Sequence, residues 1–317
     1  MESNILTDLL EYLRHTDIFK FILPIIDEYV RYIFKTKKKL KKAVIMWCKN
    51  KEKAIIKYGL ISLWNTRFIT DMRYLFCSLK SFNQPLHWDT SNVSDMYGMF
   101  SYSQSFNQPL NFDTSNVTNM SQMFSYAFAF NQPLNFNTKN VATMENMFSD
   151  AKSFNQHLNF NTKNVLDMSG MFSDAKSFNQ PLNFNTQNVT DMLGMFSDAE
   201  SFNQPLNFNT EKVISTRCMF KDANLFNQHL NFNTENITDM SCMFFRASSI
   251  NKPLNWDTKN VTNMLEMFGH ARSFNQPLNF TSTENVTNMT YMFEHAESFN
   301  QSLDFNTEKV TNMSEMF

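Results

Sequence analysis

The sequence predicts an α/β solenoid of about eleven 24-residue coils behind a helical N-terminal cap. Three observations carry this prediction. The words F-N-Q-P-L, N-F-N-T, N-V-T-N-M and M-F return at a fixed interval, for example in the units that open at Phe106, Phe130 and Phe154. The chain holds 34 Phe and 22 Met but only 5 Gly, so it can bury a large core. Charge divides it near residue 60: residues 1–60 hold 13 Lys and Arg against 7 Asp and Glu, whereas residues 61–317 hold 15 against 23.

The first segment, residues 1–58, is expected to be basic and helical. An amphipathic helix over residues 43–58 would cover the apolar end of the first coil with Val44, Trp47, Ala54 and Ile55. Before it stands a Lys-rich run, from Lys35 to Lys42. That run is open to three interpretations: a nuclear-import signal, a docking surface for an acidic partner, or a solvated helix face beside an acidic array.

The second segment, residues 59–317, is the predicted solenoid, and residues 106–129 illustrate one unit. Alternation over residues 109–113 predicts a strand with Leu110 and Phe112 pointing inward. Helical offsets follow, predicting a short helical turn, at Met120, Met123, Phe124 and Ala127. One unit buries too little apolar surface to offset the cost of ordering its backbone. Stacking must therefore stabilise it, through a continuous parallel sheet and a ring stack in the aromatic slot from Trp64 to Phe305.

The consensus F-N-Q-P-L-N-F-N-T-S-N-V-T-N-M-S-x-M-F resembles the repeat of the BspA-like group of leucine-rich-repeat-type proteins, which occur as bacterial surface lipoproteins and in giant DNA viruses. The resemblance covers about residues 59–317. It implies a right-handed leucine-rich-repeat-like solenoid with a binding or adhesive role and no enzymatic activity. The abundance of Asn, Lys, Ile and Phe would suit a giant virus or an AT-rich bacterium equally.

Composition and motifs exclude several classes of function. With five glycines the chain should offer few positive-φ turns and no phosphate-cradling loop. No catalytic constellation breaks the repeat, so neither an enzyme nor a cofactor is expected. The acidic solenoid is not expected to bind nucleic acid. No apolar run reaches membrane-spanning length, and the N-terminus shows neither a signal peptide nor a lipobox, which predicts an intracellular protein.

Three sets of residues are candidate sites because their spacing should stack them. The carboxylates of Asp150, Asp174, Asp198 and Asp222 each lie one repeat apart. Their repulsion must be relieved by a bound cation or partner, by Lys152 and Lys176, or by a rise in their pKa values. Cys218 and Cys242, expected in an exposed slot, should form a disulfide on oxidation. His270 and His295 should also stack, but two ligands do not make a zinc site, so no metal is predicted.

The favoured function is a protein–protein interaction scaffold for an unknown partner. Specificity would come from the slot that varies most in charge, which holds Ser115, Lys139, Lys163, Gln187, Glu211, Glu235 and Lys259. One alternative is a surface adhesin of the bacterial lipoprotein type. Another is a ubiquitin-ligase adaptor, because Ile5 to Ile22 faintly resembles an F-box. Phe317 ends an uncapped coil, which predicts end-to-end self-association.

Overall fold

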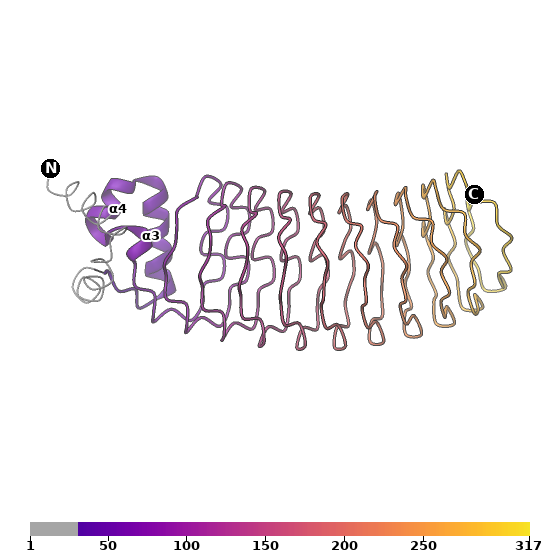
Figure 1. Ribbon diagram of the computed structural model, residues 1–317, viewed down its shortest axis with the longest axis horizontal. Helices are drawn as coiled ribbons and strands as arrows, with labels where there is room; N and C mark the ends of the chain where they lie inside the picture. The colour runs from indigo at the N-terminus through magenta and orange to yellow at the C-terminus, as the bar shows by residue number, and fades with distance from the viewer. Residues whose placement is uncertain (1–30) are drawn as a thin grey trace.

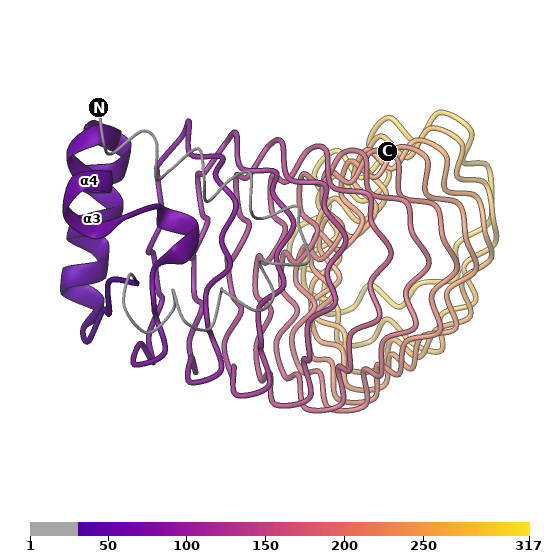
Figure 2. The ribbon, with the colours of Figure 1, turned by 60° about the vertical axis from the view of Figure 1, so that its left-hand side comes forward.

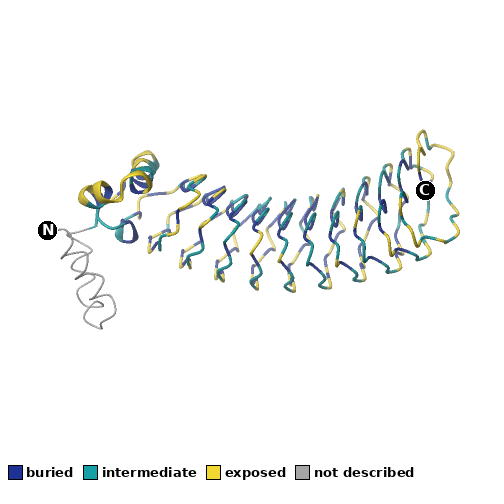
Figure 3. Ribbon diagram, turned by 90° about the horizontal axis from the view of Figure 1, so that it is seen from above, coloured by how far each residue is buried: buried dark blue, intermediate teal, exposed yellow. Residues whose placement is uncertain are grey.

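The computed structural model describes residues 31–317. They form a long, gently bowed array of stacked coils with two helices at its N-terminal end (Figures 1 and 3). The helices are α3 (Lys37–Lys49) and α4 (Lys51–Tyr58), followed by a short 3₁₀ turn, η1 (Ile61–Leu63). Figure 2 shows the coils as similar outlines following one another along the array. The solenoid and the predicted length of its repeat are therefore confirmed.

The coils are held in register by parallel pairing of positions that lie one repeat apart. Single-residue bridges join Leu86 to Leu110 and Asp95 to Asn119, and similar bridges recur along the array. The predicted continuous sheet of strands is wrong in the residues described, because only isolated bridges form there. The reason is that the backbone turns every few residues: Val117 N, for example, donates to the carbonyl of Thr114 at 3.0 Å. Leu110 and Phe112 do point inward, as predicted.

The predicted helical turn is also wrong, because residues 120–127 form a series of tight turns instead. Amides of this segment alternate between two kinds of acceptor. Gln122 N donates to the Glu145 carbonyl of the next coil at 2.8 Å, whereas Met123 N donates to the carbonyl of Met120 at 3.2 Å. Gln122 and Tyr126 both have φ of 57°, which no right-handed helix tolerates. The backbone of this segment therefore forms hydrogen bonds both to the next coil and within the segment.

The expectation that few glycines leave few positive-φ turns is wrong as well. Among the described residues, 18 non-glycine residues and four glycines have positive φ. All but Gly59 fall in two columns that run along the array. The first left-handed column is Tyr74, Gly98, Gln122, Asn146, Gly170, Gly194, Cys218, Cys242, Glu266, Tyr291 and Glu315. The second left-handed column is Ser78, Tyr102, Tyr126, Asp150, Asp174, Asp198, Asp222, Arg246, His270 and His295. Bonds between coils help to offset the conformational cost, about 1–2 kcal/mol per residue.

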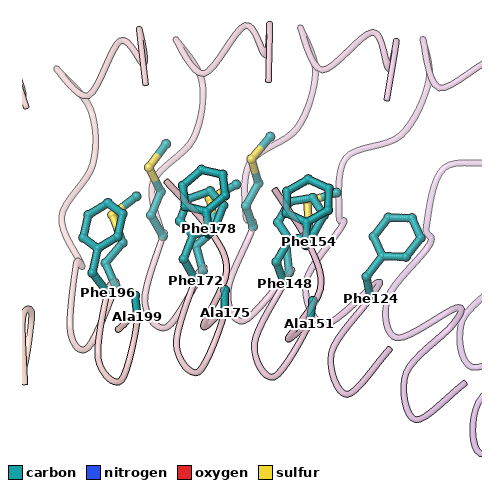
Figure 4. Packing of buried hydrophobic residues seen from close by; sticks show 14 of the residues in the cluster. Phe124, Phe148, Ala151, Phe154, Phe172, Ala175, Phe178, Phe196 and Ala199 are labelled. Atoms are coloured by element: carbon teal, nitrogen blue, oxygen red, sulfur yellow. The ribbon is translucent and has the colours of Figure 1, made fainter. Parts of the chain in front are cut away.

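The core is built on stacked phenylalanine rings. The Phe that closes each unit stacks on its counterparts with ring centroids 5.1–5.7 Å apart, in one uninterrupted column from Phe76 to Phe317. Beside it, the Phe that opens each unit forms a second column, which Figure 4 shows at Phe154 and Phe178. The single stack predicted for the aromatic slot is wrong among the described residues, because that slot contributes separate ring pairs, such as Trp64 with Trp88 at 6.1 Å.

The recurring polar letters connect one coil to the next. Asn107 N and Gln108 Nε2 both donate to Asn83 Oδ1, each at 3.0 Å, and each later F-N-Q word repeats the Asn backbone bond as far as Asn300. Buried threonines make the same kind of link elsewhere: Thr114 Oγ1 donates to the Asn137 carbonyl at 3.1 Å. The repeat therefore keeps these residues because they satisfy polar groups inside the array.

Two helices, rather than the single one predicted over residues 43–58, cover the first coil. Asn50 separates them, and its Oδ1 accepts from Lys53 N at 2.9 Å to cap α4. Val44, Trp47 and Ala54 are buried and Ile55 partly so. Trp47 packs edge-on against Trp64 of the first coil, with ring centroids 6.0 Å apart. Of the described helices, none has the length and apolarity to cross a bilayer.

Candidate functional site

The second left-handed column is the strongest candidate surface because its side chains are polar, solvent-accessible and different from coil to coil. Along the array its chemistry changes from two tyrosines to four aspartates and then to Arg246, His270 and His295. Stacking is close even here: the rings of Tyr102 and Tyr126 lie 4.3 Å apart and nearly parallel. The column places unlike chemical groups at coil spacing on a rigid support.

The four aspartates occupy consecutive coils in this column and are half-buried. Backbone bonds fix their spacing: Asp150 N donates to the Ser173 carbonyl at 2.7 Å and Asp174 N to the Ser197 carbonyl at 2.8 Å. Partial burial, together with the charges of Asp150 and Asp198, raises the pKa of Asp174 to about 6. Burial also raises the pKa of Asp150, against a hydrogen bond from Tyr126 that lowers it. Within the ladder, Asp174 therefore takes up a proton in mildly acidic solution.

The lysines predicted to neutralise the ladder have other direct partners. Lys176 Nζ pairs with Glu200, and the Lys152 ammonium lies over the Phe128 ring, 4.8 Å from its centroid. Their charges still lower the pKa of both Asp150 and Asp174.

Lys221, which the sequence analysis does not single out, pairs with the ladder directly. Its Nζ lies 2.9 Å from Asp222 Oδ2 and 3.5 Å from Asp198 Oδ2. The signal was present in the sequence, since Lys221 stands where the two preceding coils have Ser173 and Ser197.

The two stacked cysteines lie in the first left-handed column and are half-buried rather than exposed. A hydrogen bond from Cys242 lowers the pKa of Cys218 to about 7, against the effect of burial and with help from Arg217. The pKa of Cys242 is raised by the same bond, by burial and by Glu266, whose Oε2 lies 3.5 Å from the sulfur. Cys218 thus carries the more nucleophilic sulfur of the pair.

A family model described as "Mycoplasma protein of unknown function, DUF285" matches residues 46–159, 157–231 and 229–317, three tandem copies that span most of the chain. The chain belongs to this family. No curated protein and no solved structure matches it. The first DUF285 copy begins within α3, so the matched region includes part of the helices as well as the coils.

The slot that varies most in charge follows one edge of the DUF285 array. Its members from Lys139 to Lys259 are exposed, while the backbone beneath them is fixed. Asn140 Nδ2 donates to the Ser115 carbonyl at 2.7 Å, and Asn164 Nδ2 to the Lys139 carbonyl at 2.8 Å. Because the recurring Asn side chains hold the main chain, the side chains of this slot can differ without disturbing the fold.

Proposed function

We propose that this DUF285 chain is a non-enzymatic scaffold for protein–protein interaction, built as a right-handed solenoid of the leucine-rich-repeat type. Parallel pairing between successive coils supports the right-handed sense, because crossover connections between parallel strands are overwhelmingly right-handed. The BspA-like form of the repeat supports a binding role.

The charged slot is the observation that carries the proposal. Exposed Lys139 and Lys163 stand on neighbouring coils, and exposed Glu211 and Glu235 stand on neighbouring coils further along. The charged slot therefore presents its charges in a fixed order, because hydrogen bonds between coils hold the backbone beneath it. It would recognise a partner whose surface carries acidic groups opposite the lysines and basic groups opposite the glutamates.

Charge reversal within the slot tests this function. The full chain would be used to capture partners from an extract, in parallel with K139E/K163E and with a control, K49E/K53E, which makes the same charge change on exposed positions of α3 and α4. We expect a partner that binds the parent and the control but binds K139E/K163E at least about tenfold more weakly. Partners retained equally by both variants would contradict the proposal.

The other functional predictions stay predictions. The F-box-like stretch from Ile5 to Ile22 lies outside the described residues, and the adhesin and adaptor alternatives gain no specific support. Phe317 stacks on Phe293, and the predicted end-to-end association stays a prediction.

A further inference from the structure

Three metal-ligating side chains converge near the C-terminal end of the array. His270 lies on one coil, and Glu294 and His295 lie on the next. One ring nitrogen of each histidine and one carboxylate oxygen of Glu294 all lie within 4.8 Å of one another. His270 Nε2 is 3.8 Å from Glu294 Oε2, and the two imidazole centroids are 4.8 Å apart.

The coil architecture brings these residues together. Both histidines belong to the second left-handed column, although the step between them is one residue longer than the other steps of that column. The column stays in register because the extra residue near Thr281 is accommodated before the chain reaches His295. The backbones are joined directly, since His270 N donates to the Glu294 carbonyl at 2.6 Å. The repeat spacing could not identify Glu294 as a ligand, because the equivalent position one coil earlier holds Gly269.

We propose that His270, Glu294 and His295 form a binding site for Zn²⁺. Two imidazole nitrogens and one carboxylate oxygen are a ligand set that zinc accepts, with the fourth position left to water. Tetrahedral coordination at about 2.1 Å places ligand atoms about 3.4 Å apart, so no pair of ligand atoms needs to close by more than about 1.4 Å. His295 is exposed and lines an open hollow of about 310 Å³, which gives its ring room to move and gives water access to the ion.

The ion would link two successive coils. Between these residues, His270 N donates to the Glu294 carbonyl and the two imidazole rings lie tilted against each other. A metal bound to both coils must be released before they separate, so it stabilises the folded array at the expense of the separated coils.

Metal titration of the full chain tests the site. The quadruple variant C48S/C77S/C218S/C242S serves as the parent, because free thiols would bind the same ions. We expect one Zn²⁺ per chain by calorimetry, and a visible spectrum of tetrahedral Co²⁺ when cobalt replaces zinc. H270N and H295N retain a residue that tolerates positive φ, and E294Q keeps the shape of the side chain. Each should raise the dissociation constant by at least about tenfold.

H229N provides the matched control, because His229 is an exposed histidine elsewhere in the array. It should bind zinc as the parent does. Zinc should also raise the unfolding temperature of the parent and of H229N but not that of H295N, whose exposed side chain is not needed for folding. The proposal is overturned if binding is not stoichiometric, if H295N binds as tightly as the parent, or if H229N weakens binding equally.

Discussion

Lys37 Nζ lies 2.8 Å from Asp71 Oδ1 and thereby joins the first turn of α3 to the first coil of the array. Lys41 adds a second link, donating to the carbonyls of Tyr74 and Leu75 at 2.6 and 2.8 Å. Part of the basic run therefore faces the array, while Lys38 and Lys42 remain exposed.

Replacing Asp71 by Asn should weaken this junction in a pH-dependent way. Although partial burial opposes it, hydrogen bonds from Arg73 and Lys37 lower the pKa of Asp71 to about 2. A lowered folded-state pKa adds stability that is present above about pH 4 and is lost as the pH falls toward 2. D71N should cost about 1 kcal/mol of unfolding free energy at pH 7, because the pair is open to solvent, and clearly less at pH 2, where the carboxylate is about half protonated. Denaturant unfolding would measure this, with D304N, at an exposed carboxylate, as control. An equal loss at both pH values would contradict the expectation.

Replacing Asp174 by Asn should increase the unfolding free energy, whereas D71N should decrease it. Burial and neighbouring carboxylates raise the pKa of Asp174 to about 6, so its folded state loses relative stability as the pH rises from about 4 through 6. D174N should gain about 1 kcal/mol at pH 8, and this pH-linked gain should vanish below pH 4. Asp113 is the control, since a hydrogen bond from Ser115 lowers its pKa and D113N should destabilise instead. A carboxyl resonance of Asp174 that titrates at an ordinary midpoint would rule out the repulsion.

Mild oxidation should link Cys218 to Cys242. The two residues hold equivalent positions on successive coils. Their α-carbons are therefore separated by about one coil-to-coil spacing, which a disulfide can bridge. Because the thiolate is the attacking species, the rate with a small disulfide oxidant should rise as the pH passes about 7, where Cys218 ionises. Peptide mapping by mass spectrometry would detect the bridge, and C242S should lack it. Preferential pairing of either residue with Cys48 or Cys77 would disagree with the register.

Replacing Thr216 by Val should stabilise the array. Thr216 is fully buried in a column of methionines such as Met192 and Met240, and its Oγ1 has no hydrogen-bond partner among the described residues. Removing an unsatisfied buried hydroxyl should gain about 1 kcal/mol. T210V is the control: Thr210 Oγ1 donates to the Asn233 carbonyl at 2.8 Å, so its loss should cost a similar amount. Thermal unfolding would distinguish the two, and a destabilised T216V would show that the hydroxyl has a partner after all.

The sequence was a good guide to register and a poor guide to backbone conformation. Alternation over residues 109–113 placed Leu110 and Phe112 inward, and the fixed repeat placed Cys218 and Cys242 in one column, because equivalent positions of successive coils stack. Spacing could not distinguish a helix from tight turns, since both bury apolar residues three or four positions apart. Nothing in the residue types of Gln122 or Tyr126 announces positive φ. The role of Lys221 was not predicted because the equivalent position in the two preceding coils is serine.

The Asn ladder makes the length of this protein adjustable. The Asn side chain of each coil accepts from its successor, and the Asn backbone amide of that coil donates to its predecessor, so an internal coil could be excised or duplicated whole without leaving a mismatched edge. Relatives that differ in size by multiples of this unit would then share every local contact, and selection could lengthen or shorten the array independently of its ends.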